Sequence, residues 1–336
     1  MSRRAAVAAA ALVIVALLGA AAVVGIANWM LSPLVASAPD AILYVRSGAS
    51  LGEVAHELES RGLVRSAVAF EWLARYRKRA GDLKAGEYRL YAALTPEEIL
   101  SRIVEGRVAT YEVVVPEGLT AAQVALRLEA AGLVDAADFT VVVEDSTSAA
   151  ALGVEGATLE GYLFPDTYLL PHGLASRDVA KVLVDRFFEV WREIEPNARD
   201  QELSMREVVT LASIVEKETA ARDERPLIAS VFRNRLRRGM RLETDPSVIY
   251  GIPDFDGNLR RRDLENAANP YNTYIILGLP PGPIANPGAE ALRAVVNPVE
   301  SDYLFFVSRN DGTHAFSATY REHVLAVDKY QRRRVR

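Results

Sequence analysis

The chain has 336 residues, carries a net charge of −5 at neutral pH and contains no cysteine. The lack of cysteine excludes thiol catalysis, disulfides and thiolate metal sites. The slightly acidic balance gives no support for binding to nucleic acid, which requires a basic surface.

The N-terminus predicts a single-pass membrane anchor. Residues 1–4 are basic, and the uncharged run 5–31 would extend about 40 Å as a helix at ~1.5 Å per residue, enough to cross a bilayer. The arginines favour a cytoplasmic tail, so we expect an inner-membrane protein whose remaining residues are periplasmic or extracytoplasmic. A cleaved signal peptide is the alternative, although its apolar core would be shorter, ~7–15 residues. Residues 32–40 are expected to form a linker.

Two segments of the chain are copies of one pattern. Residues 48–64 and 118–134 match at several positions, and each follows a β-rich run. Ser50 and Thr120 are natural helix N-caps, and each copy closes on Gly-Leu-Val. We therefore expect a strand, a turn, a helix and a glycine stop in each copy.

The later elements indicate an α+β fold. Amphipathic helices are expected at 177–195 and 225–238, and a strand at 303–308 should lead into a hairpin turn at 310–312. About 300 residues outside the anchor are enough for two domains.

A helix that begins at Met205 carries the first candidate for chemistry. Ser204 and Glu207 form a capping box at its start. At about 100° per residue, Glu218 falls roughly 20° from Leu211, inside the apolar stripe, whereas Glu216 falls at its edge. A carboxyl there should have a raised pKa, as a general acid requires. The alternative is a glutamate beyond the last buried turn with no special environment.

Two polar-aromatic loops and a proline-glycine segment, 278–288, follow that helix. The residue before Pro246 should lie in a turn, and tyrosine and asparagine offer the apolar faces and hydrogen bonds that suit a sugar. Loops that merely cover the core are the alternative. We expect Glu218 at the floor of a groove walled by the loops of Tyr271 and Pro280. The candidate binding residues in these loops are Thr244, Asp245, Tyr271, Asn272 and Tyr274.

The motifs ASIVEKET, GMRLETDPSVIYG, YNTY and GLPPGPIANPG, in that order, resemble the endolytic murein transglycosylase family. These are membrane-anchored enzymes that cut bacterial peptidoglycan strands. The likeness extends to LEGYLFPDTY at 159–168 and THAFSATYREH at 313–323, and it covers roughly residues 45–330. Residues 136–157 and 176–202 carry no such signature.

The resemblance implies a lyase without metal or cofactor, in which Glu218 is the single acid–base. It would protonate the oxygen between N-acetylmuramic acid (MurNAc) and N-acetylglucosamine (GlcNAc). It would then accept the proton of the muramic 6-hydroxyl as a 1,6-anhydro end forms. The family pattern also implies that Glu160, Tyr162, Asp166 and Asp245 line the site; the alternative for each acid is a turn or cap. His314 and His323 show no spacing typical of a metal site.

The resemblance also implies a domain order and partners. Residues 41–108 resemble a LysM-like βααβ module, which would either bind glycan or act as a spacer. Residues 109–330 would form the catalytic transglycosylase domain, followed by a basic tail, 331–336. Implied partners are peptidoglycan glycan strands, the inner membrane, and peptidoglycan synthases and division proteins. The arginines between 233 and 241 would face peptide-stem carboxylates or simply solvent.

Two other classes of function are alternatives to a lytic transglycosylase. A non-catalytic glycan-binding scaffold of the cell-wall synthesis machinery is the first, but it has no use for a half-buried acid. A pyridoxal-phosphate lyase is excluded because Lys217 lies off the apolar face and no glycine-rich phosphate loop is present. A hydrolase would differ from a lyase only in its products.

Overall fold

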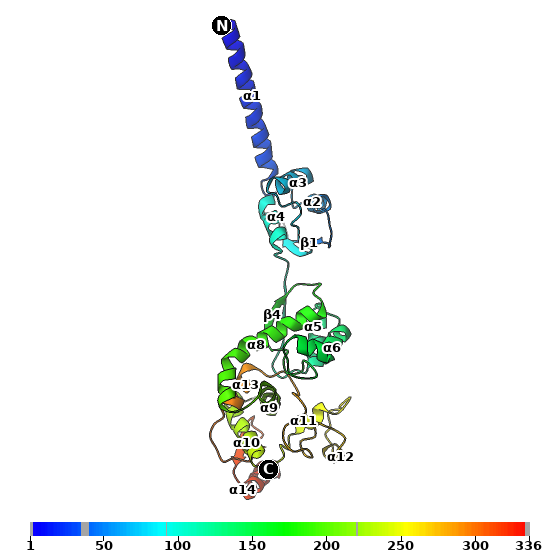
Figure 1. The fold of residues 1–336 in the computed structure, drawn as a ribbon, viewed down its shortest axis with the longest axis vertical. Helices are drawn as coiled ribbons and strands as arrows, with labels where there is room; N and C mark the ends of the chain where they lie inside the picture. Colours follow the sequence, from blue (N-terminus) through cyan, green and yellow to red (C-terminus); the bar gives the residue numbers. More distant parts are fainter. Residues whose placement is uncertain (1–2, 35–39, 92, 220, 333–336) are drawn as a thin grey trace. The chain divides into compact units, whose positions relative to one another are not determined.

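The structure is a computed structural model that describes residues 3–34, 40–91, 93–219 and 221–332. Most of the predicted linker, half of the predicted cytoplasmic tail and residues 333–336 of the basic tail lie outside the described residues. The chain forms two compact units (Figure 1). The first comprises Met1–Tyr111 and Pro171–Gly173, and the second Glu112–Leu170 and Leu174–Arg336.

The first unit begins with helix α1, Arg3–Met30. Within it, Ala11–Met30 is long and apolar enough to cross a membrane, and none of these residues is buried in the protein. Length and composition fit a membrane anchor and a signal sequence equally. The apolar helix predicted from the sequence is therefore present.

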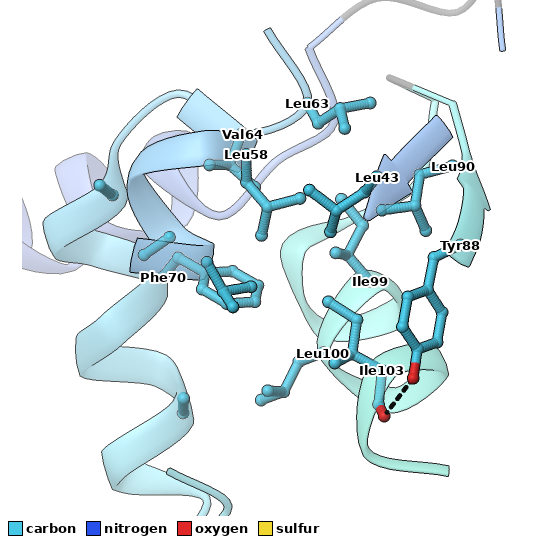
Figure 2. Close-up of a cluster of buried hydrophobic side chains, with 14 of the residues drawn as sticks. Leu43, Leu58, Leu63, Val64, Phe70, Tyr88, Leu90, Ile99, Leu100 and Ile103 are labelled. Carbon is cyan, nitrogen blue, oxygen red and sulfur yellow. Dashed lines mark hydrogen bonds between the residues drawn. The ribbon is translucent and has the colours of Figure 1, made fainter. Parts of the chain in front are cut away.

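A small module follows α1 in the same unit. Its elements are β1 (Ala41–Val45), α2 (Leu51–Ser60), α3 (Ala67–Tyr76), β2 (Gly86–Leu90) and α4 (Pro96–Glu105). Strands β1 and β2 are antiparallel, with Ala41 opposite Leu90 and Val45 opposite Gly86. The helices cover one face of this pair, and Tyr88 lies among the leucines and isoleucines with its hydroxyl donating to the Ile103 carbonyl at 3.2 Å (Figure 2).

The internal repeat has the structure expected of it. Strand β3 (Tyr111–Val114) and helix α5 (Ala121–Ala130) repeat the order of β1 and α2. The hydroxyls of Ser50 and Thr120 accept a hydrogen bond from the third residue of each helix. Gly62 and Gly132 have φ values of 66° and 70°, which only glycine adopts without strain. The second copy pairs β3 with β4 (Thr167–Leu170).

Helices dominate the second unit, whose described strands form two-stranded sheets. Helix α9 is central, and every residue from Val208 to Val215 is buried against α8, α10, α11 or α13. The elements are α6 (Ala136–Glu144), α7 (Ser146–Ala151), α8 (Ser176–Asp200), α9 (Met205–Glu218), η1 (Arg222–Glu224), α10 (Arg225–Arg237), α11 (Asp245–Tyr250), α12 (Arg261–Leu264), α13 (Ala289–Val296), β5 (Phe305–Ser308), β6 (His314–Ser317), α14 (Tyr320–Val327) and η2 (Asp328–Arg332).

The α+β class is confirmed, while three local expectations change. Helix α8 continues past Glu195 to Asp200 with Pro196 inside it. The polar turn expected at Thr244 and Asp245 is the start of α11, because a proline is tolerated in the first turn of a helix, where no N–H bond is lost. Strand β5 begins at Phe305, two residues later than predicted.

Candidate active site

Glu218 lies where the core helix α9 ends. Thr219, the next residue, is extended (φ −144°, ψ 137°), so the carboxyl leaves the core at the last helical residue. The side chain opens into a cavity of about 340 Å³. The cavity is lined by Glu218, Arg235, Leu242, Glu243, Asp245, Tyr274, Phe306 and His323.

The environment of Glu218 favours its protonated form. Burial raises the pKa of Glu218 to about 7, and the nearby charge of Asp245 acts in the same direction. The Thr244 hydroxyl donates to Oε1 of Glu218, and this bond together with His314 offsets part of the rise. A carboxyl with this pKa can donate a proton near neutral pH and take one back, as an acid–base group must.

Asp245 and Tyr274 form a second polar pair in the same cavity. The Tyr274 hydroxyl donates to Oδ1 of Asp245 at 2.7 Å. Burial raises the pKa of Tyr274, so its phenol stays a neutral donor. Asp245 is the first residue of α11, where the exposed backbone N–H groups favour a negative charge. The cavity therefore places Glu218, whose pKa is raised to about 7, beside Asp245, whose carboxyl is oriented by Tyr274.

Two buried residues hold the loops of this cavity in place. Thr244 donates its backbone N–H to the Thr273 hydroxyl at 3.0 Å, which joins the two polar loops. Asn272 is fully buried, and its Nδ2 donates to the carbonyls of Leu264 and Asn266 at 3.0 Å. Its Oδ1 accepts the N–H of Tyr274 at 3.1 Å. Asn272 thus shapes the loop and has no atom free for a ligand.

Glu160 lines a separate cavity of about 760 Å³, together with Tyr250, and Tyr271 lies behind Tyr250 without lining it. The Glu160 carboxylate accepts from the N–H of Ala121 at 3.0 Å, from Asn286 at 3.1 Å and from the Tyr250 hydroxyl at 3.2 Å. Burial raises the pKa of Glu160 to about 7. Tyr271 packs edge-on against Tyr250, with ring centroids 4.8 Å apart. Helix α11 carries Asp245 at one end and Tyr250 at the other, and so connects the two cavities.

Tyr162 and Asp166 lie away from the Glu218 cavity. Tyr162 is a core residue that packs edge-on against Phe187 at 5.0 Å, and its hydroxyl has no hydrogen-bond partner within the described residues. Asp166 accepts from Nε of Arg186 at 2.7 Å. Neither lines the cavity, so their predicted binding roles gain nothing from its geometry.

Glu216, the neighbouring candidate on α9, is fully engaged elsewhere. Its carboxylate contacts the Arg225 guanidinium at 2.5 Å and accepts the N–H of Gly288 at 3.1 Å. Both side chains of this ion pair are 5% exposed. The geometry therefore leaves Glu218 as the carboxyl that faces the cavity.

The groove walls differ from those expected. Tyr274 lines the cavity, but Tyr271 and Pro280 do not, because the proline segment packs along α9. The Ser213 hydroxyl accepts the N–H of Ile284 at 3.0 Å, and Arg206 donates to the carbonyl of Pro281. Phe306 on β5 and His323 on α14 also line the cavity.

Several residues around Glu218 have no site role among the predictions from the sequence. His314 contacts Glu224 through Nδ1 at 2.7 Å, and its backbone N–H donates to the same carboxylate at 2.8 Å. Arg235 contacts Glu243 at 2.9 Å, and both residues line the cavity. The motif THAFSATYREH contains His314 and His323. Only the resemblance of this motif to the family indicated that the segment lies near the site. In the described part of the chain, no group of three or more acids or histidines is placed to hold a metal ion.

The fold and the cavity define an α+β protein with one raised-pKa carboxyl among polar and aromatic side chains. The chain belongs to the YceG-like family, whose model matches residues 43–329. This confirms the resemblance seen in the motifs.

Two kinds of relatives agree with this membership. An endolytic murein transglycosylase of Bacillus subtilis is 30% identical over 302 residues, which cover 85% of this chain and 83% of that protein. One from Streptococcus pneumoniae is 30% identical over 297 residues, and the match spans 53% of its length. The crystal structure of a yceG-like protein from Listeria monocytogenes is 32% identical and superposes with a TM-score of 0.59, covering 85% of this chain and 98% of that one.

Proposed function

We propose that this chain is a lytic transglycosylase that cleaves the bond between MurNAc and GlcNAc in peptidoglycan, with Glu218 as its acid–base. The carboxyl of Glu218, held at a pKa of about 7 at the edge of the core, is the observation that carries the proposal. The names of the relatives, endolytic murein transglycosylases, support the substrate and the reaction.

In the proposed mechanism one carboxyl acts twice. Protonated Glu218 gives its proton to the glycosidic oxygen, and the bond to the anomeric carbon breaks. The 6-hydroxyl of the same MurNAc attacks that carbon, and Glu218 takes the hydroxyl proton, so a 1,6-anhydro end forms without water. Because Thr244 binds Oε1, the second oxygen of Glu218 is the one left for the sugar.

Asp245 has an electrostatic role in this proposal. Positive charge develops at the anomeric carbon in the transition state, and a fixed carboxylate stabilises it. The hydrogen bond that Tyr274 donates to Oδ1 keeps the Asp245 carboxylate oriented. A second carboxyl need not act as a nucleophile, because the substrate supplies its own hydroxyl.

Product analysis tests the proposal. Purified glycan strands are incubated with the wild-type chain and with Glu218→Gln, and the new ends are identified by mass spectrometry. We expect 1,6-anhydro ends from the wild type alone. Reducing ends would indicate a hydrolase, with Asp245 as the first candidate for its second carboxyl. Absence of cleavage by folded protein would favour a scaffold.

His314→Gln is expected to shift the pH profile of this activity upward. The positive charge of protonated His314 lowers the pKa of Glu218, so its removal should raise that pKa. Activity needs protonated Glu218 and falls as the pH rises through its pKa. The alkaline limb of kcat/KM should therefore move to higher pH. An unchanged limb would show that His314 does not influence the pKa of Glu218.

We also propose that the Glu160 cavity binds a further part of the glycan. Along α11, Asp245 and Tyr250 are five residues apart, about 7.5 Å at ~1.5 Å per residue, so a strand crossing the first cavity can reach the second. The ring of Tyr250 and the carboxyl of Glu160, which both line it, suit a sugar.

Tyr271→Ala should raise KM about 10-fold and leave kcat nearly unchanged, because it removes the ring that supports Tyr250, the aromatic wall of this cavity; this equals about 1.4 kcal/mol of binding. Tyr271→Phe is the matched control and should behave as wild type. Steady-state kinetics on glycan strands distinguish these outcomes. A fall in kcat with unchanged KM would contradict a binding role.

The cellular setting is part of the proposal. We take α1 as an uncleaved anchor, the small module as a LysM-like unit, and the second unit as extracytoplasmic. There the enzyme would act beside peptidoglycan synthases and division proteins and release growing strands. Membrane-bound protein of full mass supports the anchor, and normal strand lengths in a deletion mutant would contradict the role in strand release.

A further inference from the structure

Helix α3 of the small module has apolar residues on both of its faces. Phe70, Leu73 and Ala74 are buried in the module core. Val68, Trp72 and Tyr76, spaced by four residues, are 75%, 68% and 69% exposed. The rings of Trp72 and Tyr76 stack in parallel, with centroids 5.8 Å apart and planes within 3°. We call Val68, Trp72 and Tyr76 the α3 stripe. A contiguous exposed apolar surface of this kind marks an interaction site.

Contacts within the first unit place the start of α3 at the end of α1. The guanidinium of Arg65 lies 4.8 Å from the ring centroid of Trp29, the penultimate residue of α1. The same side chain donates to the Pro33 carbonyl at 3.0 Å. Leu31 packs against the module core. Ser66, which caps α3, follows Arg65 directly, so α3 begins beside the last turn of α1.

We propose that the α3 stripe docks on the surface of the lipid bilayer that α1 crosses. This inference rests on the proposed role of α1 as an uncleaved anchor. If Trp29 lies at the membrane–water interface, Arg65 and the start of α3 lie there too. Tryptophan and tyrosine are the residues that favour this interface, because their rings are apolar and carry one polar group. The tether of α1 makes lipid the surface always within reach of the stripe.

The chemistry of the stripe favours contact with acyl chains and not with lipid charge. The two arginines that flank Tyr76 are each paired with a carboxylate of the module. Arg75 pairs with Glu71 at 2.6 Å and Arg77 pairs with Glu97 at 3.0 Å. The docking should therefore persist in high salt, where attraction to anionic headgroups is screened.

The three tryptophans of the chain allow a direct test. Trp29 reports on the anchor, Trp72 on the α3 stripe, and Trp191 on the core of the second unit. Full-length variants that retain one tryptophan each, the other two replaced by phenylalanine, are placed in phosphatidylcholine–phosphatidylglycerol vesicles with brominated acyl chains. Fluorescence of Trp29 and Trp72 should be quenched, and that of Trp191 should not.

The outcomes separate the inference from the anchor proposal. Quenching of Trp29 without quenching of Trp72 would contradict docking and leave the anchor proposal intact. Quenching of neither tryptophan would contradict both proposals. Protection of Trp72 from a soluble quencher by glycan strands and not by lipid would overturn docking and identify a sugar platform.

A second measurement covers the case in which a tryptophan variant does not fold. Because the chain has no cysteine, Val68→Cys can carry the only spin label. Its label should be accessible to oxygen dissolved in lipid, and the label at Glu59→Cys, an exposed position on α2, should be accessible to a water-soluble relaxant. Equal accessibility of both labels to the water-soluble relaxant would overturn the proposal.

Discussion

Glu218→Gln is expected to lower the rate of strand cleavage by about 10²–10⁴-fold, the range that a general acid contributes. Glutamine keeps the size and polarity of the side chain and can still contact Thr244, but it has no proton to give. KM should stay nearly unchanged. The appearance of anhydro ends over time, quantified by mass spectrometry, measures the loss. Glu243→Gln removes another carboxyl from the same cavity and should retain activity.

The same substitution has a consequence for stability that depends on pH. Because burial raises the pKa of Glu218 from 4.5 to about 7, the folded state holds its proton more tightly than the unfolded state. Stability contributed by that proton is fully present below pH 4.5 and is lost as the pH rises through 7. Glu218→Gln should therefore melt above the wild type at pH 8, while the gap narrows at pH 4. A constant gap would contradict the raised pKa.

Arg225→Met should destabilise the second unit by about 3–5 kcal/mol, the cost of leaving a buried charge without its partner. Arg225 is 5% exposed and contacts the carboxylates of Glu216, Glu117 and Glu290. Loss of its guanidinium leaves Glu216 buried beside the end of α9. Urea unfolding followed by circular dichroism measures the change. Activity should fall as well, because Glu218 is two residues away on the same helix.

Two variants control for this effect. Arg222→Met removes an exposed pair with Glu290 at 3.5 Å and should cost less than about 1 kcal/mol. The double variant Arg225→Met with Glu216→Gln removes both buried charges and should recover part of the loss. A small effect of Arg225→Met, equal to that of Arg222→Met, would show that the buried pair does not hold the helix end.

Local sequence signals predicted the helices well, and they predicted the raised pKa of Glu218. Ser204 and Glu207 do form the capping box that begins α9. The apolar period of α9 predicts that Leu211, Ile214 and Val215 face the core, and all three are buried. It does not predict the burial of Thr210 and Ser213, which results from helices packed around α9 on several sides. The helices in the two copies of the repeat were predicted equally well, because helix caps and C-terminal glycines depend on residues that are close in the sequence.

The remainder of the site depends on contacts between distant segments, which periodicity does not report. Tyr162 and Glu160 are two residues apart, yet one lies in the core and the other reaches a cavity. The environment of His314 is set by Glu224, 90 residues earlier in the chain. Asn272 was expected to touch a sugar, whereas its polarity satisfies backbone carbonyls of its own loop.

Asn286 joins segments from both ends of the second unit. Its side chain donates to the carbonyl of Leu119, 167 residues earlier, and to Glu160. In the topology that we propose, residues 119 and 160 reach the outside of the membrane long before residue 286. Both cavities depend on late segments, because Asn286 holds Glu160 and because Phe306 and His323 line the Glu218 cavity. The proposed cleavage would therefore become possible only after the last segments have been exported.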